Sequence, residues 1–260
     1  MDVITSKDNA LIKEIKKLNE KKFRVQSNRF LVEGFRFVSE ALDSNFEVPT
    51  VIISDKCKDR WENFNISSKL KSNTKVIWAS DSIVRSICST ENPQGIAAVV
   101  ENKIVDVNHS EGFYVLADKL QDPGNMGTII RTANAAGALG VIITKGTVDI
   151  YNEKTLRSTM GSIFKIPIIE DLDLSVLKSL KTSGFKLIVS SLETNDNFYD
   201  LDMRGKVIIA VGNEGKGISD EIYVLADGKV KIPMPGDVES LNVAVAASVM
   251  MFEIVRQKNI

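Results

Sequence analysis

The sequence has few of the residues on which common catalytic and metal sites depend. Its 260 residues include one histidine, His109, and two cysteines, Cys57 and Cys88. Neither cysteine belongs to a Cys-x-x-Cys pair and neither has a histidine nearby, so we expect reduced thiols and no metal site. His109 lies in a polar stretch, 101–112, that predicts a solvated loop, whereas a Ser-His-Asp or Cys-His mechanism needs an oriented histidine. If the chain is an enzyme, its proton chemistry uses another residue.

Long apolar runs are also missing. The longest, 243–252, has ten residues and contains a serine. A helix that spans a bilayer needs about 20 apolar residues, so this run predicts a buried helix, and we expect no membrane partner. Residues 1–18 are charged throughout and lack the apolar segment of a secretory signal, which favours a cytoplasmic location.

The overall composition, 43% hydrophobic and 26% charged, is typical of a soluble globular protein and excludes a disordered tail, a collagen-like repeat or a disulfide scaffold. The net charge is −1, but residues 1–100 carry 16 basic and 13 acidic residues. A basic strip at 13–36 fits either a polyanion such as RNA or the solvated face of an amphipathic helix, and charge alone leaves both open. The candidate RNA-binding residues in this strip are Lys21, Lys22, Arg24, Arg29 and Arg36.

The hydrophobic pattern divides the chain into two αβ blocks. A helix is expected at 6–22, and strands at 29–34, 48–54, 75–80 and 95–101 complete a small domain. The polar segment 102–111 is the candidate linker, which gives an N-terminal domain of residues 1–104 and a second domain of residues 105–260. In the second block, strands are expected at 113–118, 140–144, 185–191, 206–212 and 229–233, with helices at 125–136, 152–163, 173–183, 218–226 and 241–257. These strands lack polar alternation, which is typical of a mostly parallel sheet with helices on both faces.

The informative residues follow the strands of the second block. After the first of them, Asp122-Pro123-Gly124 predicts a turn, Asn125 occupies an expected helix N-cap, and Arg131 lies six residues further on. A capped β-to-α turn accounts for this segment on its own.

A glycine-rich segment, 211–219, follows a later strand. It is not a P-loop, because Lys216 precedes Gly217 rather than serine or threonine, and its glycine spacing is not that of a dinucleotide-binding turn. It still predicts a tight loop against a ligand or another chain segment. The third segment, 232–254, begins with the proline-rich IPMPG and continues through Ser240-Leu241-Asn242, with Ser240 as the expected N-cap of an apolar helix.

As a set, Asn125 with Arg131, the glycine-flanked Glu214, and IPMPG followed by Ser240-Leu241-Asn242 resemble the three motifs of the SpoU (TrmH) family. These are S-adenosylmethionine-dependent RNA ribose 2′-O-methyltransferases of the SPOUT superfamily. The match covers 113–256 with all three motifs in order. The basic N-terminal block, with RFLVEGFRFVSEAL at 29–42, resembles the substrate-binding domain of ribosomal-RNA members of the family.

The resemblance implies an α/β SPOUT domain with a deep trefoil knot, S-adenosylmethionine as the cofactor, and a homodimer formed through the catalytic domain. By motif position, the implied cofactor-binding residues are Gly212, Ile232 and Leu241, with Ser190 and Leu192 closing the site.

The resemblance also implies the catalytic residues Arg131, Asn125, Glu214, Ser240 and Asn242. The family proposal makes Arg131 the base that deprotonates the ribose hydroxyl. A guanidinium with a pKa above about 12 is almost never neutral. We therefore expect Arg131 to clamp the adjoining phosphate and to lower the hydroxyl's pKa electrostatically, with Asn125 orienting it, while Glu214 and Asn242 brace the knot loops or the ribose.

The N-terminal block favours large-subunit rRNA as the substrate. A tRNA 2′-O-methyltransferase is an alternative, and so is a non-catalytic rRNA-binding or assembly protein on the same scaffold. The non-catalytic protein is expected to have lost Asn125, Arg131 or the segment 240–242, and all are present. A SPOUT base methyltransferase is expected to lack the Asn125 and Arg131 pair.

Overall fold

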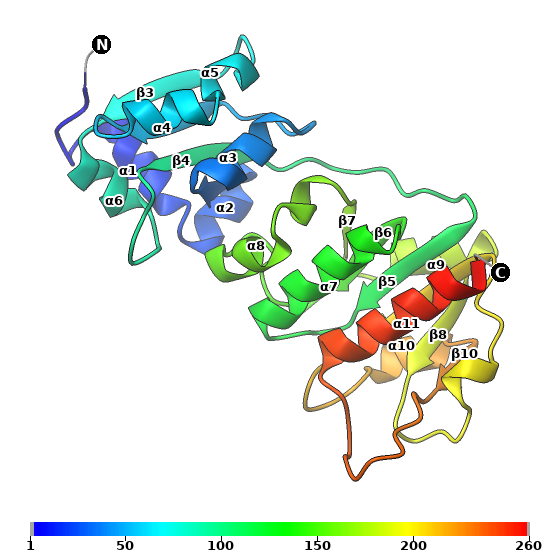
Figure 1. Ribbon diagram of the computed structural model, residues 1–260. Helices are drawn as coiled ribbons and strands as arrows, with labels where there is room; N and C mark the ends of the chain where they lie inside the picture. The colour runs from blue at the N-terminus through cyan, green and yellow to red at the C-terminus, as the bar shows by residue number, and fades with distance from the viewer. Residues whose placement is uncertain (1–2, 259–260) are drawn as a thin grey trace. The chain divides into compact units, whose positions relative to one another are not determined.

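The protein, described by a computed structural model over residues 3–258, consists of two compact units (Figure 1). The first unit contains the chain up to Ile104 together with Tyr151–Phe164, and the second contains Val105–Ile150 and the chain from Lys165 onward. The return of Tyr151–Phe164 to the first unit was not part of the expected division at residue 104. Within residues 3–258, no helix combines the length and the apolar character needed to cross a bilayer.

The first unit is built on a mixed four-stranded sheet of order β1-β4-β2-β3. The first two neighbouring pairs are antiparallel and β2 and β3 are parallel. The strands are β1 (Arg29–Glu33), β2 (Thr50–Ser54), β3 (Lys75–Ala79) and β4 (Ile96–Glu101). The helices are α1 (Ala10–Lys17), α2 (Lys21–Ser27), α3 (Phe35–Leu42), α4 (Lys58–Asn63), α5 (Ile66–Lys69) and α6 (Asp81–Ile87).

The single helix expected at 6–22 is wrong, because two helices cover this region. The Asn9 side chain accepts hydrogen bonds from the backbone N–H groups of Leu11 and Ile12, which sets the start of α1. From Leu18 to Glu20 each backbone N–H donates to the carbonyl oxygen three residues back, and Glu20 is extended with ψ of 131°. The tightened turn ends α1, and α2 begins afresh at Lys21.

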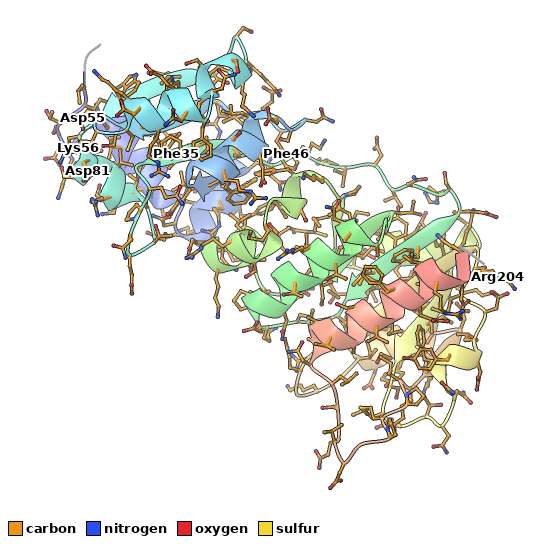
Figure 2. The ribbon with its side chains drawn as sticks, in the orientation of Figure 1. Phe35, Phe46, Asp55, Lys56, Asp81 and Arg204 are labelled. Atoms are coloured by element: carbon orange, nitrogen blue, oxygen red, sulfur yellow. The ribbon has the colours of Figure 1, made fainter. Side chains whose placement is uncertain are left out.

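Residues 151–164 join the core of the first unit through aromatic rings. They form α8 (Glu153–Thr159) and a short 3₁₀ turn, η1 (Ser162–Phe164). The ring of Phe164 lies 5.2 Å from that of Phe37 and 5.4 Å from that of Phe46, which Figure 2 labels. Gly161 has φ of +82°, which favours glycine, and a Cβ there would lie 1.9 Å from Glu40 Oε2, so a side chain would strain the backbone and displace the Glu40 carboxylate.

The second unit contains a six-stranded sheet of order β10-β8-β9-β5-β6-β7, in which every neighbouring pair is parallel. The strands are β5 (Gly112–Ala117), β6 (Gly140–Thr144), β7 (Ile168–Asp171), β8 (Lys186–Ser190), β9 (Lys206–Val211) and β10 (Gly228–Val230). The expected mostly parallel sheet is confirmed. The short strand β7 was not expected, because its four residues alternate between buried and more exposed positions.

Helices cover both faces of this sheet (Figure 1). On one face, α9 (Ser175–Thr182) and α10 (Asp220–Leu225) bury Leu177, Leu180 and Ile222 against the strands. The other helices are α7 (Pro123–Ala135) and α11 (Val243–Lys258), which pack against each other, and a 3₁₀ turn η2 (Phe198–Asp200) follows β8. Because all six strands run in one direction, the loops that follow them meet at one edge. The trefoil knot implied by the resemblance stays a prediction.

Candidate active site

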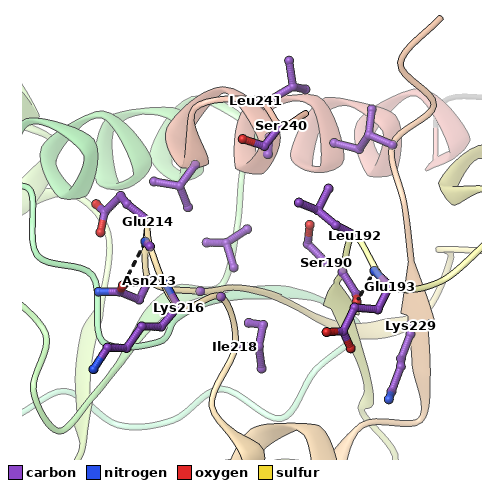
Figure 3. Close-up of a pocket in the computed structure, with 18 of the residues that line it drawn as sticks. Ser190, Leu192, Glu193, Asn213, Glu214, Lys216, Ile218, Lys229, Ser240 and Leu241 are labelled. Carbon is purple, nitrogen blue, oxygen red and sulfur yellow. Dashed lines mark hydrogen bonds between the residues drawn. The ribbon is translucent and has the colours of Figure 1, made fainter. Parts of the chain in front are cut away.

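A cavity of about 810 Å³ opens in the second unit beside the carboxyl ends of β8 and β9 (Figure 3). Four chain segments supply most of its lining: 190–193, the glycine-rich loop 211–218, residues Ile232 and Met234, and 240–243. Ligands of open parallel sheets bind at this edge, and their pockets measure about 300–1,000 Å³. The cavity is therefore the candidate active site.

All five of the expected cofactor-binding residues line this cavity: Gly212, Ile232, Leu241, Ser190 and Leu192. Gly212 leaves no room for a side chain, because a Cβ there would lie 2.2 Å from the carbonyl carbon of Gly217. Two backbone hydrogen bonds of 2.9 Å between Asn213 and Gly217 close the loop on itself. The loop thus keeps its backbone groups against the cavity.

The lining fits S-adenosylmethionine. Ile218, Ile232 and Leu241 offer apolar surface to a flat adenine ring, and the glycine loop offers backbone groups to its polar edge. No group of histidine, cysteine, aspartate or glutamate side chains that could hold a metal ion occurs among residues 3–258. The apolar side chains and the backbone of the glycine loop suit an organic cofactor with a flat aromatic ring.

One hydrogen-bonded chain links three segments of the sequence beside the cavity. Asn125 donates from Nδ2 to Glu214 Oε1 over 3.0 Å, and its Oδ1 accepts from Asn242 Nδ2 over 3.0 Å. Glu214 also accepts from the backbone N–H groups of Gln121 and Asp122, both at 3.3 Å. The amide of Asn125 therefore has a fixed orientation, and Glu214 and Asn242 brace the loops.

Two of the expected helix caps are wrong. Asp122, not Asn125, caps α7, because its Oδ1 accepts from the backbone N–H of Asn125 over 2.8 Å. Asn242, not Ser240, caps α11, because its Oδ1 accepts from the N–H groups of Ala244 and Val245. The asparagine amide at 125 is thereby free to bridge the other two motifs.

The pKa of the Glu214 carboxyl lies below its usual value. Burial alone would raise this pKa, but the hydrogen bonds from the Asn125 amide and from the backbone of Gln121 and Asp122 stabilise the carboxylate more strongly. Glu214 therefore acts as a charged acceptor rather than as a proton donor.

The structure does not place Arg131 in the cavity lining. Arg131 is exposed on α7, while the neighbouring Thr132 accepts a hydrogen bond of 3.4 Å from Ser248 of α11. Ser240, by contrast, lies at the cavity (Figure 3). Of the five expected catalytic residues, the structure brings Asn125, Glu214, Ser240 and Asn242 to the cavity and its hydrogen-bonded chain, and leaves Arg131 exposed on α7.

In the first unit, the five expected RNA-binding residues have different surroundings. Lys21 and Lys22 are exposed on α2. Arg24 is only 8% exposed, and its Nη1 donates to the carbonyl oxygen of Leu18 over 2.7 Å, so it holds the turn between α1 and α2 instead of presenting its charge. Arg29 pairs with Glu101 at 2.7 Å, and Arg36 pairs with Glu40 at 3.1 Å.

Sequence reasoning missed several residues that shape the site. Asn213 accepts from the N–H groups of Gly215 and Lys216 and donates to the carbonyl oxygen of Lys119 over 2.9 Å. Asparagine side chains often accept a hydrogen bond from the backbone N–H two residues further on, here that of Gly215, and this turn signal could have revealed the role of Asn213. The acid Asp122 just before Pro123 likewise matches a helix start with proline at the first position.

The chain matches two family models. The SpoU rRNA methylase family model matches residues 112–252, and the MRM3-like substrate binding domain model matches residues 9–98. The Bacillus subtilis 23S rRNA (guanosine(2553)-2′-O)-methyltransferase RlmP is 36% identical over 257 residues, with 98% of this chain and 99% of that protein covered.

Solved structures of RNA methyltransferases are also similar to this chain over nearly its whole length. An rRNA methyltransferase from Sinorhizobium meliloti is 31% identical with a TM-score of 0.88, covering 98% of this chain and 97% of that chain. The SpoU methyltransferase AviRb from Streptomyces viridochromogenes, in complex with AdoMet, is 29% identical with a TM-score of 0.88, covering 96% of this chain and 98% of that one. The chain therefore belongs to the SpoU rRNA methylase family.

Proposed function

We propose that this chain methylates a ribose 2′-hydroxyl of large-subunit ribosomal RNA with S-adenosylmethionine as the methyl donor. The observation that carries the proposal is the Glu214–Asn125–Asn242 chain of hydrogen bonds at the cavity that Gly212, Ile232 and Leu241 line. Similarity to RlmP of B. subtilis over 98% of this chain supports rRNA as the substrate, because RlmP is named for a guanosine of 23S rRNA.

In the reaction, the hydroxyl oxygen bonds to the methyl carbon as the carbon–sulfur bond breaks, and the hydroxyl proton is released. When bound, the cofactor supplies the electrophilic methyl group, and the protein supplies alignment and charge. The glycine loop and Leu241 hold the cofactor in our proposal, while the fixed Asn125 amide orients the ribose. Arg131 clamps the phosphate next to the reacting ribose and favours loss of the proton.

The position of Arg131 also supports a homodimer. Arg131 is exposed on α7, and Val245 and Phe252 on the neighbouring α11 are 49% and 51% exposed. We propose that a second copy covers this apolar surface, so that Arg131 lies at the substrate when two copies associate. We further propose a cytoplasmic location, where ribosomal RNA is accessible.

The N-terminal domain, residues 1–104, is proposed to bind the RNA, and residues 105–260 to catalyse the transfer. A cavity of about 400 Å³ is bordered by α1, α2 and the sheet, and Lys17, Phe23 and Arg29 line it. The ammonium of Lys17 lies 5.3 Å from the centre of the Phe23 ring. An aromatic ring with cations beside it suits an unpaired nucleotide, which stacks its base and offers its phosphate. Lys21 and Lys22 add charge on the same helix.

Mapping 2′-O-methylation across total RNA from cells with and without this chain tests the proposal. We expect one ribose methylation of 23S rRNA to disappear, and the purified chain to restore it on unmodified rRNA. Replacing the target nucleotide by its 2′-deoxy form should abolish the transfer. Loss of a methyl group from tRNA, or from a base, would reject the proposed substrate, and an unchanged map would favour a non-catalytic rRNA-binding protein.

A further inference from the structure

A buried carboxylate, Asp118, joins three elements of the second unit. Asp118 follows β5 and is 1% exposed. Its Oδ1 accepts from the Thr144 hydroxyl over 2.8 Å, and its Oδ2 accepts from the backbone N–H of Ser219 over 2.7 Å. Burial of a carboxylate is costly unless its oxygens are hydrogen-bonded, and here both are. Asp118 therefore ties the ends of β5 and β6 to the start of α10.

The N–H that Asp118 holds lies between residues that line the cavity. Ile218 and Asp220, on either side of Ser219, belong to the lining, as does Tyr223 one turn further along α10. Asp118 itself is not among the lining residues. The carboxylate thus supports this wall of the cavity from behind, where the glycine loop passes into α10.

A second buried carboxylate offers an internal comparison. Asp171 ends β7, is also 1% exposed, and accepts from the N–H groups of Val176 and Leu177 at 3.2 and 2.8 Å. These residues begin α9, and none of them lines the cavity. Asp118 and Asp171 each accept hydrogen bonds from backbone N–H groups at the start of a helix. Of these two, Asp118 alone supports a wall of the candidate active site.

We propose that Asp118 is a positioning residue for S-adenosylmethionine, which fixes Ile218, Asp220 and Tyr223 in the arrangement that the cofactor meets. This inference rests on the proposed function, because it takes S-adenosylmethionine as the ligand of the cavity. Without Asp118 the chain from Ile218 to Tyr223 loses its attachment to β5 and has to be ordered by the cofactor, which weakens binding.

The test compares Asp118→Ala with Asp171→Ala in the full chain, by calorimetric titration with S-adenosylmethionine and by thermal unfolding. Both substitutions remove a buried carboxylate and leave its donors unpaired, so both should lower the melting temperature. Asp118→Ala should weaken cofactor binding by about tenfold or more, whereas Asp171→Ala should change it by less than about twofold. In turnover, Asp118→Ala should raise KM for the cofactor while kcat at saturation stays within about twofold.

Two further variants keep the test decisive. Asp118→Asn retains an oxygen for the Ser219 N–H and an amide for Thr144 Oγ1, so its affinity should stay within about threefold of wild type. Thr144→Val removes the hydroxyl that holds the carboxylate and should weaken binding by about threefold to tenfold, which covers the case in which Asp118→Ala fails to fold. Wild-type affinity for S-adenosylmethionine in a folded Asp118→Ala or Thr144→Val variant would overturn the proposal. Weakening of the affinity by Asp171→Ala to the same extent as by Asp118→Ala would also overturn it. A wild-type chain that binds no S-adenosylmethionine would instead count against the proposed function.

Discussion

Asn242 and Asn125 join their side-chain amides over 3.0 Å although 117 positions separate them in the chain. Asn242 has two functions in this arrangement: its Oδ1 caps α11, and its Nδ2 donates to Asn125. Because Asn125 Oδ1 accepts from Asn242, the Nδ2 group of Asn125 is directed toward Glu214. Capping of the apolar helix and orientation of the proposed ribose contact are therefore coupled through one side chain.

Asn242→Asp separates the two functions. An aspartate still accepts the N–H groups at the start of α11, but it has no N–H to donate to Asn125 Oδ1, so two oxygens face each other. We expect the melting temperature to stay near that of wild type and the methyl-transfer rate to fall by about tenfold or more. Thermal unfolding and rates at saturating cofactor check this.

Asn242→Ala is the companion variant. It removes the cap as well as the bridge, and the loss of a helix N-cap costs about 1 kcal/mol. It should therefore lose both stability and activity. A wild-type rate in Asn242→Asp would show that the bridge to Asn125 has no part in the reaction.

The lowered pKa of Glu214 predicts a dependence of stability on acid. Because the folded-state pKa lies below the ordinary 4.5, the carboxylate contributes stability that is fully present above pH 4.5 and is lost as the pH falls through the folded-state value. Glu214→Gln does not titrate there. The difference in unfolding free energy between wild type and Glu214→Gln, measured by denaturant titration, should be largest above pH 4.5 and shrink in more acid solution. A difference that is constant with pH would contradict the assigned hydrogen bonds.

The motif loops could be located from the sequence, because they depend on local signals that recur in a parallel α/β sheet. Glycines 212, 215 and 217 marked the tight loop, and Ser240-Leu241-Asn242 marked the start of α11. The partners within the site could not be located in this way. Whether Asp122 or Asn125 caps α7 depends on Glu214, 89 positions beyond Asn125, which engages the asparagine amide.

Contacts between distant parts of the chain also determine features that local sequence patterns do not predict. The helix α8 has ordinary helical spacing, and its sequence does not show that the flanking aromatic residues belong to the first unit. Phe164 packs against Phe37 and Phe46, and Tyr151 stacks on Phe30. Arg24 lay in a basic strip that looked solvated, yet its guanidinium bonds the carbonyl of Leu18. Charge patterns show where cations are frequent, and burial decides which of them remain available.

Replacing Lys21 and Lys22 by glutamine tests the RNA surface of the first unit. Each phosphate contact that is lost reduces the slope of the logarithm of affinity against the logarithm of salt concentration by about 0.7 to 0.9. We expect weaker rRNA binding at low salt and a shallower slope, with unchanged affinity for S-adenosylmethionine. Filter binding over a range of salt concentrations measures both quantities.

A matched control removes two charges elsewhere in the same unit. Lys56, which Figure 2 labels, and Lys58 are also exposed, so their replacement by glutamine changes the net charge equally. RNA affinity and slope should stay near wild type in this control. If the two double variants behave alike, the effect is one of net charge and the proposed surface on α2 is rejected.

Arg131 provides the sharpest division between a catalytic and a structural account. It is exposed, does not line the cavity, and makes no ion pair that the structure records among residues 3–258. We therefore expect Arg131→Ala to leave cofactor affinity and melting temperature nearly unchanged while methyl transfer falls by about a hundredfold or more, as when a donor to developing charge is removed. Arg131→Lys should be almost as damaging, because an ammonium does not replace a planar, bidentate contact with phosphate.

The competing account places Arg131 in contact between two copies of the chain, since the exposed Val245 and Phe252 lie on the neighbouring helix α11. Size-exclusion chromatography of Arg131→Ala beside wild type distinguishes the two. An alanine variant that elutes like wild type, binds S-adenosylmethionine and fails to transfer the methyl group supports the phosphate clamp. A variant that elutes as a smaller species than wild type assigns Arg131 to association of the two copies. A variant with wild-type elution and wild-type turnover removes Arg131 from the reaction, and the fixed amide of Asn125 would then have to orient the ribose without it.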